Sequence, residues 1–354
     1  MLESFFTPRH MAAAILKEPR LLGGKVERGA IILSHVDSVV QLFPDLRRFF
    51  FLLERKGWHG LAHARTADIK FVEDLSFLEV TARIFPRAIL LPLSNADFVD
   101  TSTFRPLGDP PEYDVIQIAC WRQRKRIELL IQAAAQLPHL SFVQLGSFEL
   151  GGTTEELEYR DACISLAAQT GARVTFPFGH CGLNHELPWD KHVINQWINK
   201  ARIGVLTASR EGHNRFKMEC MAADRPVLIA SDAGTTTQKH INERTGCLFQ
   251  ATPEALARAI TEMLSRRESF APRCHVLEHS GHAVSLAKLR NALRQACAQS
   301  GETYRFDDIE WDGRNEHYSW GEEAFALVKG KLDGYRAQSA CPAGAALGGE
   351  LVLG

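Results

Sequence analysis

The sequence predicts an α/β fold built around a doubly wound parallel sheet. From residue 114 onward, short apolar runs alternate with segments of helical length whose apolar residues recur at helical spacing. The chain has 354 residues, which leaves room for two domains, and 45% of them are hydrophobic and 23% charged. That composition is typical of globular proteins. We therefore expect a two-domain globular α/β protein.

Charge and cysteine content narrow the class of protein. Lys and Arg number 41 against 42 Asp and Glu, so the formal net charge of -1 gives no general attraction to nucleic acid. The eight cysteines are scattered without a C-x-x-C pair, a pattern that favours reduced thiols over a disulfide framework or a zinc site. No apolar run approaches the length of a membrane span. We expect a cytoplasmic protein that does not bind nucleic acid.

The first 106 residues predict an N-terminal domain with few clear strands. Residues 30–33 and 88–91 have the apolar character of buried strands, and residues 44–56 read as a helix opened by Pro44. This helix mixes basic and aromatic residues, so a peripheral membrane face is conceivable, but a helix that covers a sheet explains the same residues and is preferred. His63 lies in a stretch without clear helical or strand periodicity. It is a candidate functional residue only if it ends a strand and faces a cleft.

A Pro- and Gly-rich segment, residues 107–113, predicts a linker between the domains. The second domain, residues 114–316, then shows regular alternation. We expect strands at 115–118, 141–145, 173–176, 203–206, 227–229 and 245–249, and helices at 123–137, 155–170, 193–201, 216–223 and 253–266.

The C-terminal part of the chain is less regular. Residues 268–316 read as an insertion with a helix near 285–299. A last helix is expected at 317–336, packing back toward the N-terminal domain. Residues 337–354 are rich in small residues and predict a disordered tail.

Two glutamates stand out around the strand–turn–helix at residues 203–223. Glu211 falls in the turn and Glu219 two turns into the helix, so both would face the carboxyl end of the strand, where open parallel sheets bind ligands. The amides of residues 212–215 would be free at a helix N-terminus, which suits a diphosphate. Taken alone, a helix-end charge and a solvated glutamate explain the pair equally well.

Four patches in sequence order resemble the retaining, nucleotide-sugar-dependent glycosyltransferases of the GT-B fold, family 4 type. Glu211 and Glu219 match the family's E-x7-E signature, and residues 221–227 resemble its A-M-A-C-G-x-P-V continuation. The other patches are residues 93–97 with 104–106, similar to N-G-V-D...F-x-P; residues 125–133, similar to K-G-x-x-x-L-I-x-A; and Tyr318-Ser319-Trp320, similar to F-S-W.

The resemblance implies two Rossmann-like domains and a role for each matching residue. Lys125 would hold the donor diphosphate, Glu219 would accept the ribose hydroxyls, and Glu211 would contact the donor sugar. The backbone amides of Gly212, His213 and Asn214 would lie against the phosphates. The family's chemistry needs neither a metal ion nor another cofactor, because the leaving phosphate can take the acceptor's proton on the same face of the sugar.

The chain also departs from the family pattern. Ala119-Cys120 stand where the family carries Gly-Arg ahead of the lysine, so Arg122 or Arg124 would have to supply the second phosphate cation. Ala96 replaces the interdomain glycine and Asp224 a later one.

About 95 residues precede the interdomain signature, fewer than the family's acceptor domain contains. The N-terminal domain is therefore expected either to be reduced or to lack a part that this chain does not include. His63 is the candidate for the family's cleft histidine and is counted with Glu211 and Lys125 as a catalytic residue.

The expected function is that of a retaining glycosyltransferase moving a sugar from a nucleoside diphosphate to a hydroxyl of a glycan, lipid or small molecule. Its partners would be the donor and the hydroxyl acceptor, with a peripheral contact at the inner membrane face or a homo- or hetero-oligomer as further possibilities. Two alternatives keep the fold. One is a non-catalytic nucleotide-sugar-binding partner of another glycosyltransferase, and the other is a nucleotide-sugar epimerase or hydrolase.

Overall fold

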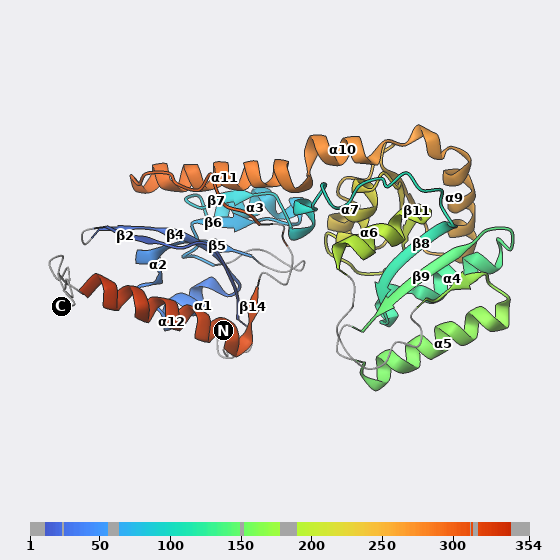
Figure 1. Cartoon of the computed structure of the whole chain (residues 1–354), viewed down its shortest axis with the longest axis horizontal. Coiled ribbons are helices and arrows are strands. Elements are labelled where there is room, and N and C mark those ends of the chain that lie inside the picture. The colour runs from blue at the N-terminus through green and yellow to red at the C-terminus, as the bar shows by residue number, and fades with distance from the viewer. Residues whose placement is uncertain are drawn as a thin grey trace, which may run out of the picture. The chain divides into compact units, whose positions relative to one another are not determined.

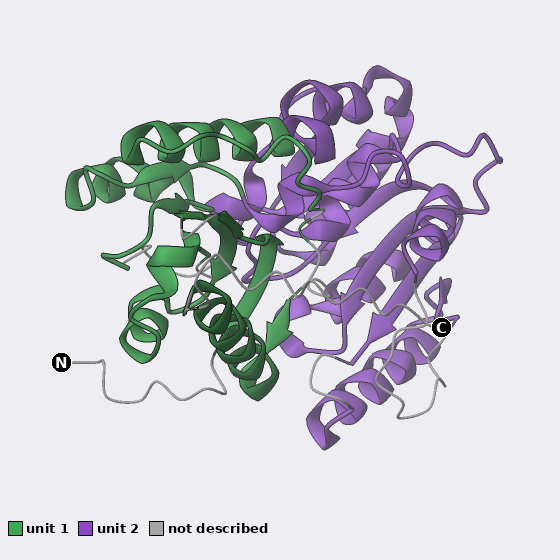
Figure 2. Cartoon of the chain, turned by 60° about the vertical axis from the view of Figure 1, so that its left-hand side comes forward, with its two compact units in different colours: residues 1–93, 286–354 green, residues 94–285 purple. Residues whose placement is uncertain are grey.

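A computed structural model describes residues 11–22, 25–55, 64–148, 152–177, 190–311, 313 and 318–340. The chain divides into two compact units, coloured green and purple in Figure 2. The first contains residues 1–93 and 286–354, and the second contains residues 94–285. The expected linker, residues 107–113, and the start of the expected insertion, residues 268–285, thus group with the second unit.

The second unit contains a six-stranded parallel sheet in the order β10-β9-β8-β11-β12-β13. This order is that of the dinucleotide-binding Rossmann fold, and it changes direction between β8 and β11. The doubly wound parallel sheet expected from the sequence is confirmed. The strands are β8 (Tyr113–Cys120), β9 (Phe142–Ser147), β10 (Val174–Thr175), β11 (Ala201–Leu206), β12 (Val227–Ala230) and β13 (Gly246–Phe249).

Helices cover both faces of this sheet (Figure 1). Apolar residues of α6 and α7 pack with Ile116 and Val143 on one face, whereas those of α4 and α9 pack with Val115 and Phe142 on the other, because neighbouring residues of a strand point to opposite faces. The helices are α4 (Ile127–Ala135), α5 (Thr154–Thr170), α6 (Lys191–Asn199), α7 (Arg215–Ala222), α8 (Thr235–Gln238), α9 (Pro253–Ser265) and α10 (Pro272–His279), with the 3-10 helices η3 (Asn95–Phe98), η4 (Gln123–Lys125) and η5 (Arg267–Ser269).

Two residues that stand at glycine positions of the resembling family adopt left-handed backbone. Arg126 has φ 47°, so the helix expected from residue 123 is interrupted there: η4 ends at Lys125 and α4 begins at Ile127. Asp224 has φ 61°, and its carboxylate accepts a hydrogen bond from the backbone N–H of Arg273 at 3.2 Å. Aspartate tolerates this conformation better than most residues. Ala96, by contrast, lies in η3 without a positive φ.

The first unit contains a second six-stranded sheet, in the order β14-β1-β4-β5-β6-β7. Strands β4 to β7 are parallel, and β1 runs antiparallel to both β4 and β14. Its strands are β1 (Ala12–Lys17), β4 (Gly29–Leu33), β5 (Phe50–Glu54), β6 (Ile69–Phe71), β7 (Ile89–Leu91) and β14 (Ser319–Trp320); β2 (Arg20–Leu22) and β3 (Lys25–Glu27) form a separate hairpin.

The prediction of a helix at residues 44–56 is wrong. Only α2 (Leu46–Phe49) is helical there, and β5 follows it at once, with all five residues buried. An unbroken run of apolar residues is compatible with a buried parallel strand as well as with a helix, and here pairing with β4 and β6 decides between them. This segment therefore does not form the amphipathic helix that suggested a membrane face.

The last helix, α12 (Gly321–Ala340), belongs to the first unit. Its residues Ala324, Val328, Leu332 and Tyr335 are buried in the same apolar cluster as α2. It runs past residue 337, the expected start of the tail; residues 341–354 lie outside the described part. The remaining helices of this unit are α1 (Val36–Leu42), η2 (Leu75–Phe77), α3 (Leu78–Ile84) and most of α11 (Gly281–Ser300).

Within the described residues, every helix is too short or too polar to cross a bilayer. The six cysteines in the same part of the chain are free thiols, and Cys274 alone among them is exposed.

Candidate functional site

Lys125 and Glu211 meet at the point where the strand order of the second unit reverses. Lys125 ends η4, directly after β8, and Glu211 lies in the loop between β11 and α7. Because β8 and β11 are adjacent parallel strands, their carboxyl ends open into one crevice, the usual ligand site of such sheets. The Lys125 ammonium forms an ion pair with Glu211 Oε2, and both side chains are largely buried.

Hydrogen bonds to the backbone hold this pair in place. The hydroxyl of Thr207 donates to the carbonyl of Lys125 at 2.6 Å, and the hydroxyl of Thr237 donates to the carbonyl of Glu211 at 2.8 Å. Arg126 reaches over the same strand end: its Nε donates to the carbonyl of Thr207 at 2.7 Å, and its guanidinium pairs with both oxygens of Asp232. A charged pair fixed by its surroundings is pre-organised for binding.

The loop between Glu211 and α7 offers backbone donors. Asn214 is the N-cap of α7, and its side chain accepts from the amide of Lys217 at 3.1 Å. Within the described chain, the amides of Gly212, His213 and Asn214 donate to no protein acceptor. Free amides at the start of a helix attract anions.

Glu219 lies on the second turn of α7 and is 6% exposed, with Arg215 Nε 3.6 Å from its carboxylate. The arginines after β8 lie farther from the pair. Arg124 Nη1 is 3.9 Å from Glu211 Oε2, whereas Arg122 Nη1 is 4.0 Å from Glu156. Arg124 is thus placed with Lys125, and Arg122 faces α5. His63 lies outside the described residues, and where it lies relative to this crevice stays a prediction.

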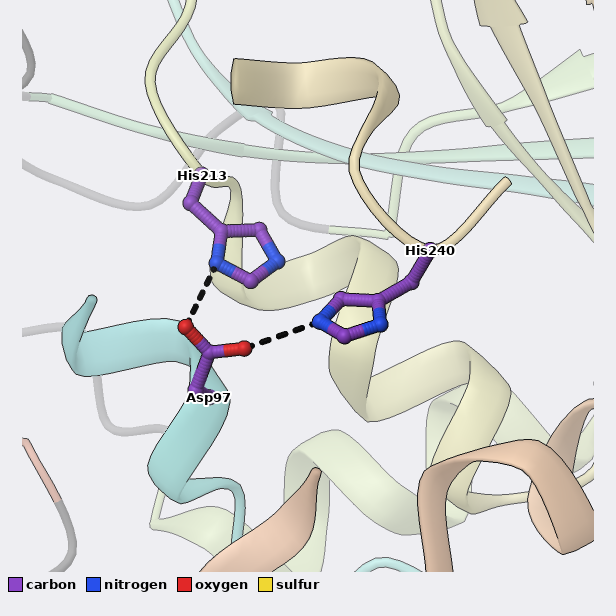
Figure 3. Close-up of side chains that lie close together, drawn as sticks. All are labelled: Asp97, His213 and His240. Atoms are coloured by element: carbon purple, nitrogen blue, oxygen red, sulfur yellow. Dashed lines mark hydrogen bonds and ion pairs between the residues drawn. The ribbon is translucent and has the colours of Figure 1, made fainter. Parts of the chain in front are cut away.

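The side chain of His213 points away from the loop surface into a buried polar cluster, which sequence reasoning missed. Its Nδ1 faces Asp97 Oδ2 at 3.2 Å, and His240 Nε2 lies 2.9 Å from Asp97 Oδ1 (Figure 3). Asp97 also accepts from Lys239 Nζ at 2.9 Å and from the amide of Ser94 at 2.7 Å. Asp97 belongs to the N-G-V-D-like patch, and that motif was the one sequence feature that could have pointed to the cluster. No motif includes His240 or Lys239.

Burial and neighbouring charges set the protonation of this cluster. Burial alone would raise the pKa of Asp97, but His213, His240 and Lys239 hold that pKa well below its usual value. Burial lowers the pKa of His213 to about 3, and the nearby cation of Lys217 acts in the same direction. His213 is therefore a neutral imidazole beside an ionised Asp97, and its Nδ1 shares a hydrogen bond with the hydroxyl of Ser94.

The donor atoms of Asp97, His213 and His240 lie within 4.8 Å of one another, the chemistry of a two-histidine, one-carboxylate metal site. Two lysines argue against a divalent cation there. Lys239 already occupies Asp97 Oδ2, and Lys217 is buried and donates to the carbonyls of Thr237 and Lys239. The cluster fits a hydrogen-bond network that anchors the loop carrying His213.

Acidification is expected to destabilise the protein through His213. Its folded pKa of about 3 lies below the unfolded value near 6.5, so between these values the unfolded chain binds more protons and stability falls as pH falls. From pH 7 to pH 5 this histidine should cost about 2 kcal/mol of unfolding free energy. Urea denaturation of wild type and His213→Gln at both pH values measures it. His213→Gln should lack this loss of unfolding free energy between pH 7 and pH 5, whereas His139→Gln, at an exposed position, should show it as the wild type does.

The comparisons with known proteins agree with this geometry. Residues 114–266 match the family model described as glycosyl transferases group 1. No curated protein matches the sequence.

Solved structures of glycosyltransferases are similar in fold. Sucrose-phosphate synthase from Thermosynechococcus elongatus is 21% identical, with a TM-score of 0.53 over 73% of this chain and 71% of that one. HepE from Anabaena in complex with UDP is 15% identical, with a TM-score of 0.56 over 73% and 76%. HepE with UDP and glucose gives a TM-score of 0.55 at 15% identity, over 72% and 74%. Residues 114–266 are thus similar to the group 1 glycosyl transferases, and the chain has the GT-B fold.

Proposed function

We propose that this protein is a retaining glycosyltransferase that moves a sugar from a nucleoside diphosphate to a hydroxyl acceptor. The observation that carries the proposal is the Lys125–Glu211 pair at the strand-order reversal of the second unit, beside the free amides of residues 212–214. A lysine and a row of backbone donors are what a diphosphate needs, and carboxylates accept hydrogen bonds from sugar hydroxyls.

Each group has a separate task in this proposal. The Lys125 ammonium and the loop amides bind the diphosphate and stabilise the charge that develops on it when the glycosidic bond breaks. Glu211 holds Lys125 in place and contacts the donor sugar, and Glu219 accepts the ribose hydroxyls. Arg124, 3.9 Å from Glu211, adds the positive charge that Ala119-Cys120 do not supply in place of the family's Gly-Arg.

The acceptor's proton passes to the departing phosphate on the same face of the sugar, so the anomeric configuration is kept. No protein base is needed for this step, and catalysis rests on positioning and charge stabilisation.

The test is a panel of UDP-, GDP- and dTDP-sugars, with UDP-glucose first because a structural neighbour binds UDP and glucose. Release of nucleoside diphosphate in the presence of hydroxyl acceptors is followed, and NMR coupling at the anomeric carbon gives the configuration of the product. Glu219→Gln should lower donor affinity, because an amide replaces two accepting oxygens, whereas Glu112→Gln, which changes a surface pair with Lys200, should not. An inverted product, or wild-type protein that neither binds nor consumes any donor, contradicts the proposal.

A further inference from the structure

An arginine-rich pocket of about 770 Å³ lies within the first unit. Its lining comes from the segments that lead into the parallel strands: Arg28 precedes β4, Arg47 lies on α2 before β5, Arg65 to Asp68 precede β6, and residues 84–88 precede β7. The last turns of α11 complete it with Gln299 and Ser300. The volume is that of a small-molecule site.

This pocket is at the amino ends of β4 to β7. In open parallel sheets, substrates bind at the carboxyl ends of the strands. The acceptor hydroxyl of a glycosyltransferase would be expected at that other edge of this sheet. The pocket is therefore separate from the chemistry proposed above.

The charges around the pocket are unbalanced. Arg28 is neutralised by Glu302, which accepts from its Nε at 2.7 Å, and its guanidinium stacks on Phe51 at 3.8 Å. Asp68 is the carboxylate in the lining; its Oδ2 accepts from the amide of Leu52, and its Oδ1 is 3.9 Å from Arg47.

Arg65 and Arg87 are exposed, and neither side chain forms an ion pair with another described residue. Glu302 and Asp68 thus pair with Arg28 and Arg47, and the nearby Asp37 carboxylate accepts from the amides of Arg65 and Thr66 and from the Thr66 hydroxyl. Among the described residues, the guanidinium groups of Arg65 and Arg87 therefore have no carboxylate partner. Ile84, Phe85 and Pro86, which precede Arg87, give the lining an apolar part.

We propose that this pocket binds a phosphate group carrying about two negative charges, a phosphomonoester or a diphosphate. The planar guanidinium fork matches two phosphate oxygens at once, and Arg65 and Arg87 are the groups free to make that contact. The apolar wall formed by Ile84 to Pro86 accommodates the carbon part of the ligand beside its phosphate. The phosphate could be that of a soluble molecule or of a lipid headgroup, and the experiment separates these sources.

Binding is measured on the full chain with two probes. Inorganic pyrophosphate is titrated calorimetrically in a Lys125→Met background, which removes the competing phosphate site proposed in the second unit. Vesicles of phosphatidylcholine with and without phosphatidic acid are used in a sedimentation assay. The pocket variants are Arg65→Gln, Arg87→Gln and their combination. The matched control is Arg83→Gln, which changes an exposed arginine of α3 outside the pocket lining.

Each pocket substitution should raise the pyrophosphate Kd about tenfold, the effect of losing one charge-assisted hydrogen bond, with unchanged thermal unfolding. Arg83→Gln should bind as the parent does. Vesicle binding that needs both phosphatidic acid and the two arginines identifies a lipid phosphate, and pyrophosphate binding alone identifies a soluble ligand. Wild-type protein that binds neither probe, or binding that survives the double substitution, overturns the proposal. Either result leaves the glycosyltransferase proposal intact, because that rests on residues of the second unit.

Discussion

Lys125→Met is expected to lower kcat/KM for the sugar donor about 100-fold or more. The side chain is 9% exposed and forms an ion pair with Glu211, so its charge acts in a site from which water is largely excluded. Removing one such donor from developing negative charge typically costs about 3 to 4 kcal/mol of transition-state stabilisation. Methionine keeps the length and apolar body of lysine, so packing is retained. Initial rates across donor concentrations, together with the Kd of the nucleoside diphosphate, measure the loss.

The matched control for this change is Lys191→Met. Lys191 lies on α6 in the same unit, outside the crevice. Its ammonium forms a 2.7 Å ion pair with Asp100. Its loss should leave the rates within about twofold, because Lys191 pairs with Asp100 and not with Glu211. Lys125→Met with near wild-type kcat/KM and normal nucleotide affinity would show that this lysine does not hold the phosphates.

Asp97→Asn is expected to lower the unfolding free energy by about 3 to 5 kcal/mol. The carboxylate is fully buried and accepts from His240, Lys239 and the amide of Ser94. An asparagine keeps the shape but leaves the Lys239 ammonium without its counter-charge and presents an N–H group where an acceptor is required. Urea denaturation gives the free energy.

Asp232→Asn provides the contrast. Asp232 also loses an arginine partner, Arg126, but its side chain is 51% exposed, so water replaces the interaction and the change should stay within about 1 kcal/mol. Equal destabilisation by the two variants would contradict the view that burial makes the Asp97 network strong. Asp97→Asn should also weaken donor binding, because the network anchors His213 in the loop whose amides face the crevice.

The second unit could be predicted closely because its strands are short apolar runs separated by strong turn signals. All six of its strands are present where the sequence placed them, and α9 begins at Pro253, where its helix was expected. The start of α4 was missed, since nothing in the residues 123–127 shows that Arg126 takes a left-handed conformation.

The first unit was harder to predict for a physical reason. Residues 50–54 form β5, buried on both faces, and such a strand has no alternating pattern to distinguish it from a helix. The two-residue strand β14 lies more than 300 residues from its partner β1 along the chain, and only that pairing makes it a strand. Long-range pairing of this kind leaves no local signal.

The sequence by itself determined the α/β class and the succession of strands and helices along the second unit, and it singled out Lys125, Glu211 and Glu219 as candidate site residues, because these depend on local periodicity and on motif spacing. Only the tertiary structure decided that Lys125 pairs with Glu211, that His213 turns inward to Asp97, and that four arginines surround one pocket. Each of these arrangements brings together side chains from distant segments. In the Lys125–Glu211 and His213–Asp97 pairs, burial then makes the electrostatic interaction stronger than it is in the unfolded chain.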